Sequence, residues 1–117
     1  MSRLKTSVVV EGDGEVAGTA IECAMTTELR LELAAGRPVS GVHAEAPRGR
    51  LTFGFSPDLN TAMYDALEAM LTWMGSVYGL GKADALALAS PVLDLGVTQV
   101  ANESWGVHAL LPWDAIA

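Results

Sequence analysis

The sequence predicts a single α+β domain in which a helical hairpin lies between amino-terminal and carboxy-terminal strands. Three observations support this: short strand-like segments fill the first half, a helical period of apolar residues begins near Phe55, and strand-like segments return near Leu95. Strands followed by helices and then strands indicate the α+β class, with layers of β-sheet against the hairpin. The 117 residues are enough for one compact domain, so we predict that residues 1–117 form a single domain.

The first half of the chain is predicted to be mostly strands. Residues 27–33 alternate strictly between leucines and charged residues, which is typical of a strand with one face in water. Residues 34–36 break this pattern, so we expect residues 39–45 to pair back onto that strand as a hairpin. The predicted strands are residues 7–10, 16–25, 27–33, 39–45 and 51–55, with a turn at residues 47–50.

The first predicted helix covers residues 57–79. Its apolar residues recur in steps of three and four, which places them on one face of an amphipathic helix. Ser56 is the predicted N-cap, and Asp58 stands in the first turn, where the helix dipole favours negative charge. The apolar residues of this face, and Trp73 beside them, are predicted to form core or helix–helix contacts: Leu59, Met63, Leu67, Met70, Met74 and Val77.

The second helix is predicted over residues 82–89, and Pro91 is expected to stop it. The carboxy-terminal strands are predicted at residues 96–100 and 106–111, with a polar turn at residues 102–104 between them. The chain therefore returns to the sheet after the helical hairpin.

Composition excludes several classes of partner. Seven basic and fourteen acidic residues give a net charge of −7, and the basic residues are scattered, so we expect neither nucleic acid nor an anionic membrane surface as a partner. No apolar run is long enough for a membrane span or a signal peptide. Cys23 is the single cysteine, which excludes an internal disulfide and a cysteine-rich zinc site. We therefore expect a cytoplasmic location.

Residues 12–15 read Gly-Asp-Gly-Glu and allow two interpretations. Asp-Gly is a strong hairpin signal, so the segment is predicted to be a turn with solvated acids. Alternatively, the carboxylates of Asp13 and Glu15 bind a divalent cation or act as a general base, since the glycines let the backbone approach a ligand closely.

Glu22, Cys23, His43 and His108 are the other candidate functional residues. Glu22 interrupts an apolar run, so it is either exposed at a strand edge or buried and functional. A nucleophilic Cys23 requires a nearby histidine, and a buried thiol is the alternative. His43 and His108 lie on predicted strands outside any local metal-binding pattern, so each is predicted to be a hydrogen-bonded or surface residue rather than a metal ligand.

Two segments together resemble the acetamidase/formamidase family. Residues 12–22, GDGEVAGTAIE, look like the segment GDGE-x-x-G-T-x-x-E of that family. Residues 84–112 are similar to its carboxy-terminal pattern DA…L.S…D…Q.V…V…LP, through Asp84-Ala85, Ser90, Asp94, Gln99-Val100, Val107 and Leu111-Pro112. The ordered matches cover nearly the whole chain, but family members are much longer. The resemblance is therefore to their carboxy-terminal portion.

This resemblance implies a metal-dependent amidohydrolase acting on linear amides such as formamide and acetamide. It implies Glu15 as general base and proton donor, Asp13 as a second catalytic residue or metal ligand, and Glu22 as a further metal ligand. The implied cofactor is a divalent metal, zinc or calcium. The family usually has G-D-x-H-A just before the glycine–acid segment. Here Thr6 and Val8 stand where the aspartate and histidine are expected, and neither replaces a metal ligand.

That departure keeps an alternative open: a non-catalytic assembly or small-molecule-binding module derived from the family. Missing ligands would otherwise come from a second subunit or from a separate amino-terminal amidase portion. Half of the residues are hydrophobic in a chain this small, so we expect a homo-oligomer, with a dimer the simplest form. The long helix, or Trp105 and Trp113, is the predicted interface.

Overall fold

The computed structural model describes residues 2–10, 12–19, 21–33, 36 and 39–116, with the backbone alone for residues 2–10. It has the predicted α+β fold, with both helices between amino-terminal and carboxy-terminal strands. The elements of the described chain follow in the order β1 Ser2–Val10, β2 Ile21–Leu29, β3 His43–Ala46, β4 Gly49–Ser56, α1 Leu59–Tyr78, α2 Lys82–Val92, β5 Asp94–Gln99 and β6 Trp105–Pro112.

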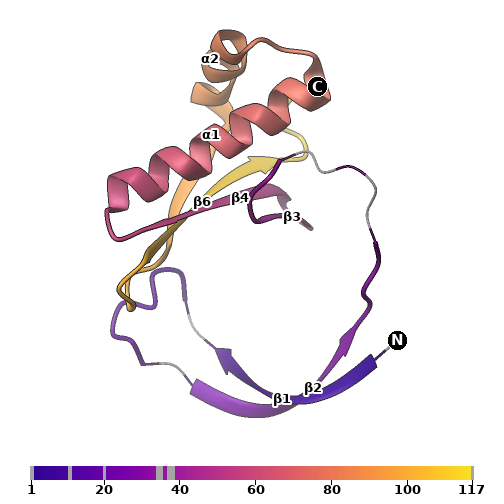
Figure 1. Ribbon diagram of the computed structural model, residues 1–117, viewed down its shortest axis with the longest axis vertical. Helices are drawn as coiled ribbons and strands as arrows, with labels where there is room; N and C mark the ends of the chain where they lie inside the picture. The colour runs from indigo at the N-terminus through magenta and orange to yellow at the C-terminus, as the bar shows by residue number, and fades with distance from the viewer. Residues whose placement is uncertain (1, 11, 20, 34–35, 37–38, 117) are drawn as a thin grey trace.

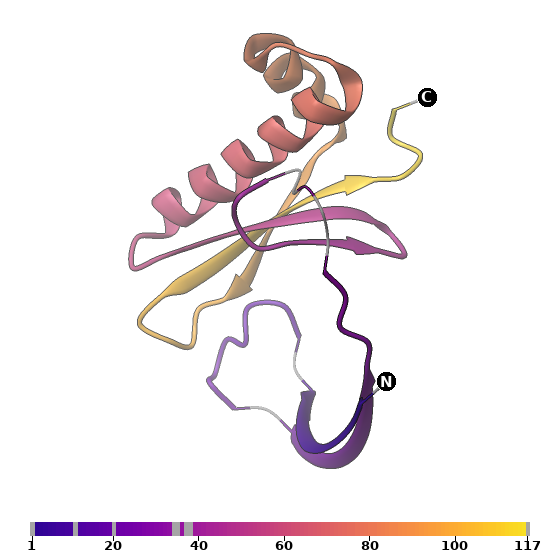
Figure 2. The same cartoon turned by 45° about the vertical axis from the view of Figure 1, so that its right-hand side comes forward.

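The strands form two separate antiparallel sheets. β3, β4, β6 and β5 make a four-stranded sheet in that spatial order, and β1 pairs with β2 in a two-stranded ribbon. Helix α1 crosses one face of the larger sheet over β4 and β6, and α2 packs against α1. The ribbon lies on the other side of this sheet from the helices (Figures 1 and 2). One face of the larger sheet is therefore left without a helix.

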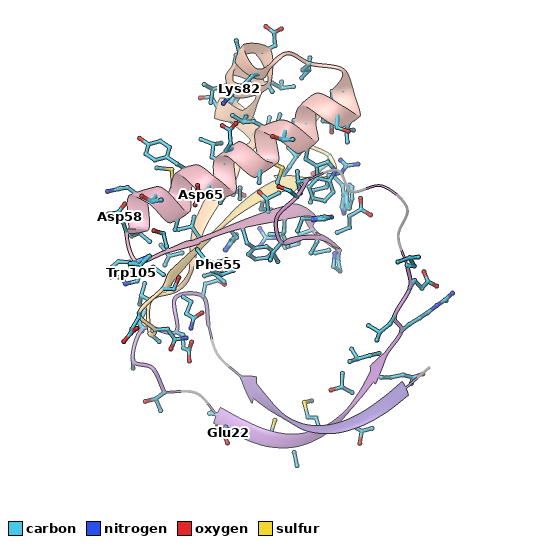
Figure 3. All side chains as sticks on the ribbon, in the orientation of Figure 1. Glu22, Phe55, Asp58, Asp65, Lys82 and Trp105 are labelled. Carbon is cyan, nitrogen blue, oxygen red and sulfur yellow. The ribbon has the colours of Figure 1, made fainter. Side chains whose placement is uncertain are left out.

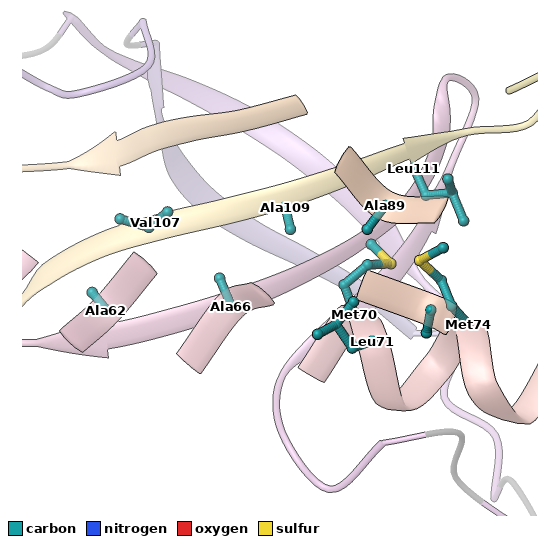
Figure 4. Packing of buried hydrophobic residues seen from close by; sticks show 10 residues of the cluster. Ala62, Ala66, Met70, Leu71, Met74, Ala89, Val107, Ala109 and Leu111 are labelled. Atoms are coloured by element: carbon teal, nitrogen blue, oxygen red, sulfur yellow. The ribbon is translucent and has the colours of Figure 1, made fainter. Parts of the chain in front are cut away.

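The hydrophobic core fills the space between α1 and the larger sheet (Figure 4). Ala62, Ala66 and Met70 are four residues apart, so they form one stripe on the helix, and all three are fully buried. The buried Thr52 hydroxyl donates to the Ala66 carbonyl oxygen at 2.7 Å, which satisfies the one polar side chain of this contact. Other members of the core are Leu71, Met74, Ala85, Ala89, Val107, Ala109 and Leu111.

The prediction for the first helix was correct in extent and wrong in its cap. Asp58, not Ser56, is the N-cap of α1: its Oδ1 accepts from the Thr61 amide at 2.7 Å and from the Thr61 hydroxyl at 2.9 Å. Ser56 ends β4 and accepts from the Asp58 amide. At the other end, Gly79 adopts φ 68°, the left-handed conformation that glycine accepts readily at a helix end.

Pro91 does not stop the second helix, which continues to Val92. A proline lacks the amide hydrogen and disturbs the preceding turn, but in the last turn that loss affects one bond. The Leu93 amide donates to the Ala89 carbonyl and closes the helix end. The carboxy-terminal strands are confirmed, with β5 starting two residues earlier than predicted.

The amino-terminal strands differ most from the prediction. Residues 27–33 are not one strand, because β2 covers Ile21–Leu29 and the chain is irregular from residue 30. Leu31 and Leu33 are almost fully exposed, so their alternation buries nothing. Residues 16–18 form turns rather than the start of a strand. The predicted break lies partly outside the described residues.

The predicted hairpin partner is also wrong. β3 pairs with β4 through a turn at Pro47 and Arg48, and not with the segment before it. The turn itself is where the sequence predicts it.

The carboxy-terminal segment is tied to the edge of the larger sheet. The Trp113 indole N–H donates to the Ala46 carbonyl at 2.9 Å. The Arg50 guanidinium lies 4.6 Å from the Trp113 ring and 5.8 Å from the Trp73 ring, so it stacks between them. None of the helices in the described chain is both long and apolar enough to cross a membrane.

Candidate functional site

A cavity of about 450 Å³ opens on the sheet face that α1 leaves uncovered. Side chains alternate along a strand, so Thr52 and Gly54 face the helix while Leu51 and Phe53 face the cavity. The same alternation on β6 turns His108 and Leu110 toward it. A mostly apolar wall with a few polar groups is typical of small-molecule sites. The lining residues are Asp13, Ala46, Pro47, Arg48, Leu51, Phe53, Thr98, His108 and Leu110.

His108 is the central polar group of this cavity. Its Nδ1 lies 2.8 Å from the Thr98 hydroxyl on the neighbouring strand, which fixes the ring orientation. Where Thr98 donates to Nδ1, the proton is on Nε2, which then donates to a ligand. Where Thr98 accepts, Nε2 is an acceptor. The ring centroid is 6.5 Å from that of Phe53, so an aromatic side chain flanks the imidazole.

Gly96 makes room for the imidazole. It is directly opposite His108 in the β5–β6 register, and a Cβ at this position would lie 2.5 Å from Cε1 and 2.6 Å from Nε2. Any other residue would therefore displace the His108 ring. The glycine and the histidine together set the shape of the cavity floor.

The Gly-Asp-Gly-Glu segment brings Asp13 to the cavity wall. The Gly14 amide donates to the Thr98 carbonyl, and the Val100 amide donates to the Gly14 carbonyl, each at 2.9 Å. This parallel bridge fastens the β1–β2 loop to the end of β5. Gly14 has φ 95°, which favours glycine. The segment is thus a turn, as one interpretation predicts, and it also places Asp13 beside the same Thr98 that orients His108.

The other two predicted site residues lie elsewhere. Glu15 is half-buried with φ 41°, an unusual conformation for a residue other than glycine, and its carbonyl accepts from the Gly18 amide. It does not line the cavity. Glu22 is on β2, and its side chain points away from the larger sheet (Figure 3). Glu22 is exposed, which agrees with the first of the two interpretations of this residue, exposure on a strand, and not with a buried functional carboxylate. The structure therefore brings Asp13 together with His108, and leaves Glu15 and Glu22 apart from them.

Two cavity residues, Arg48 and Thr98, are not singled out by the sequence, and His108 is predicted only as a hydrogen-bonded or surface residue. Arg48 is in the β3–β4 turn and supplies a cation beside the cavity. Sequence spacing gives no sign that Thr98 and His108 meet, because their proximity depends on strand register. His43, the other histidine, is on the helix side of the sheet, where Nδ1 is 2.9 Å from the Gly41 carbonyl and the ring packs edge-on to Trp73.

The described residues do not supply a complete metal site. Among them, no group of three or more histidine, cysteine, aspartate or glutamate side chains is placed to hold a metal ion. Asp13 and His108 line the cavity, whereas a catalytic metal site usually takes three protein ligands and a water. In β1, Thr6 lies opposite Met25 and Val8 opposite Cys23 in register. The donor set of this portion of the chain therefore does not fit a divalent metal by itself.

No family model and no curated protein sequence matches this chain. Among solved structures, it is similar to an acetamidase from Bacillus halodurans, with a TM-score of 0.81 and 24% sequence identity. The match covers 88% of this chain but 35% of the acetamidase, so this chain spans a small part of that protein's length. At this identity the likeness is one of fold. The chain has the fold of part of an acetamidase.

Proposed function

We propose that this chain is an acetamidase-like module, equivalent to the carboxy-terminal portion of that family, which binds a short linear amide or its carboxylate product beside His108. The observation that carries the proposal is the cavity: an acetamidase fold presents Asp13, Arg48 and the Thr98–His108 pair around an apolar wall. These groups match the polar and apolar parts of such a ligand.

A primary amide has one carbonyl acceptor and two N–H donors. Asp13 accepts from the amide N–H, and His108 Nε2 donates to the carbonyl oxygen when Thr98 donates to Nδ1. The methyl group of acetamide packs on Phe53 and Leu110, which also line the cavity. Arg48 attracts the carboxylate that hydrolysis produces. The chain's own residues therefore explain binding and orientation of the ligand.

Hydrolysis needs more than the described residues supply. Family resemblance assigns Glu15 the roles of general base and proton donor, but its side chain does not line the cavity. We propose that a second polypeptide surface, from another subunit or from a separate amino-terminal amidase portion, completes the centre. The isolated chain then binds zinc or calcium weakly, because two carboxylate or imidazole ligands must be desolvated for few bonds.

The test is a titration of the purified chain with acetamide and with acetate, followed by amide NMR. We expect saturable shifts at Thr98 and His108, and about tenfold weaker binding in His108→Ala, since one hydrogen bond to the ligand is lost. Glu22→Gln, a change of a predicted site residue outside the cavity, is the matched control and retains full affinity. Absence of saturable binding, or shifts that avoid the cavity, contradicts the proposal.

A second candidate function is a non-catalytic binding or assembly module, which the incomplete donor set favours. Measuring ammonia release from acetamide distinguishes a module that is part of an enzyme from a non-catalytic module. We expect none from the chain alone, and release in the presence of a complementary amidase portion if the module is part of an enzyme. Near-stoichiometric zinc after dialysis, with hydrolysis abolished by Glu15→Gln, would instead establish a complete enzyme in this chain.

A further inference from the structure

Strand β2 of the ribbon exposes large apolar side chains on one of its faces. Glu22 points away from the larger sheet (Figure 3), so the alternating positions Ile21, Met25 and Leu29 lie on the opposite ribbon face, toward that sheet. Ile21 is 72% exposed, Met25 51% and Leu29 41%. Exposed apolar residues that share one face of a strand indicate a docking surface rather than scattered surface residues.

The uncovered face of the larger sheet is a second apolar surface. Phe53 and Phe55 stack there with ring centroids 6.3 Å apart, and Phe55 is 49% exposed. Within β4 and β6, both fully described, alternation places no aspartate, glutamate, lysine or arginine on this face. The two central strands therefore add no formal charge to this face, whose charged groups include Asp13 and Arg48 at the cavity and Asp94 opposite Leu110.

The two surfaces face each other without packing together in one copy. Beyond the pairing of β1 with β2, the ribbon makes no extensive contact with another described helix or strand. The radius of gyration is 15.9 Å, compared with about 13 Å for a compact domain of this size. The ribbon is thus an extended arm, connected to the larger sheet through the Gly14 bridge.

We propose that two copies of this chain exchange these arms, so that the ribbon of each copy lies on the uncovered sheet face of the other. Each ribbon then closes its partner's cavity beside His108. The proposal does not depend on which amide or carboxylate the cavity binds. It places the dimer interface on the ribbon and the sheet, rather than on the long helix or on Trp105 and Trp113.

The dimensions of the surfaces suit a stable dimer. A nine-residue ribbon of two strands is roughly 30 Å long and roughly 10 Å wide, so one face covers roughly 300 Å². Each copy contributes one ribbon face and one sheet face, and the reciprocal contact buries roughly 1,200 Å² in total. This reaches the range of specific protein interfaces.

Reciprocity favours a second copy as the occupant. One chain carries both the arm and the surface that receives it, so a two-fold pair buries both surfaces of both copies at once. A different protein that covered the sheet face would leave the ribbon face exposed unless it had a receiving surface as well. Two chains of net charge −7 repel each other. Dissolved salt screens this repulsion between charges at the solvent-exposed edge of the proposed interface.

The experiment measures mass by light scattering for the full chain and for three variants with matched exposure. Ile21→Glu places a charge on the arm, Phe55→Glu places one on the sheet face, and Tyr64→Glu changes a residue of α1 that is 63% exposed. We expect twice the 12.2 kDa chain mass for the wild type and Tyr64→Glu, and the chain mass for the other two. Circular dichroism checks folding, and Met25→Glu replaces Ile21→Glu if that variant unfolds.

A mixing experiment tests the exchange itself. In a mixture of the arm variant and the sheet variant, the intact arm of one chain meets the intact face of the other, so one of the two contacts is restored. We therefore expect a mixed dimer from two monomeric variants. The proposal is overturned if the wild type is monomeric, if either Ile21→Glu or Phe55→Glu still forms a dimer, or if the mixture of the two variants stays monomeric. It is also overturned if assembly requires a separate amidase portion.

Discussion

The space above Gly96 determines where the His108 imidazole lies. Because a Cβ would stand 2.5 Å from Cε1, Gly96→Ala is expected to push the ring out and break the 2.8 Å contact with Thr98. We predict about tenfold or greater loss of acetate or acetamide affinity, since an oriented donor is lost, with the fold retained. NMR titration measures it. Gly41→Ala, where nothing lies within 4 Å, is the control and retains affinity.

At the residue scale, the sequence predicts what is local and misses what depends on register. Asp13 is found because glycines flank it within a short motif, and the structure places it on the cavity wall. The sequence predicts His108 as a hydrogen-bonded or surface residue but not its place in the cavity, because its partner Thr98 is ten residues away and meets it only once β5 and β6 pair. Gly96 gives no signal by itself either, since a glycine in a strand has several uses.

At the element scale, helix α1 approaches β4 most closely at Gly54. A Cβ there would overlap the Ala62 carbonyl oxygen, which belongs to the helix backbone and has no rotamer to change. Gly54→Ala is therefore expected to destabilise the fold by about 2 kcal/mol, as overpacking does. Urea unfolding measures the difference. Gly41→Ala, whose Cβ would meet nothing within 4 Å, is expected to be neutral or slightly stabilising.

The start of α1 makes stability depend on pH. The Thr61 amide, and then its hydroxyl, donate to Asp58 and hold the pKa of this carboxyl below its usual value. Because the pKa of Asp58 is lowered on folding, the ionised carboxylate stabilises the folded state at pH values above its pKa in the unfolded chain. This stabilisation is lost as the pH falls through the pKa of Asp58 in the folded state.

We therefore expect Asp58→Ala to lower the thermal midpoint at neutral pH, and the difference from the wild type to shrink in acid. Asp58→Asn, which keeps a capping acceptor without charge, retains more of the midpoint and lacks this pH dependence. A difference between Asp58→Ala and the wild type that is constant with pH would contradict the assignment of the cap.

Elements with a buried face are the ones that the sequence predicts well. The spacing from Leu59 to Val77 predicts α1 as an amphipathic helix, but the predicted face is only partly right: Ala62, Ala66 and Met70 form the fully buried stripe, while Leu59, Met63 and Leu67 are partly buried and Val77 is 44% exposed. Residues 27–33 have an equally regular alternation, but Leu31 and Leu33 contact no core, so nothing holds them in a strand. β3 pairs with β4 across the predicted turn at Pro47 and Arg48, although the sequence assigns residues 39–45 to the preceding segment as their partner.

For the whole molecule, the proposed exchange of ribbons would make the free energy that holds the ribbon depend on a second copy. One chain offers few contacts to β1 and β2, so their amide hydrogens exchange through an opening of low free energy, while β4, β6 and α1 open close to global unfolding. The proposed arm exchange would add contacts by mass action. We therefore expect hydrogen exchange in residues 21–29 to slow over about a hundredfold rise in protein concentration, and the rates in residues 59–78 to change little.

In the Phe55→Glu variant, which is expected to be monomeric, the ribbon amides should exchange fast at every protein concentration. If ribbon protection is the same in dilute and concentrated wild-type protein, the arm is held within its own copy and the exchanged dimer is wrong.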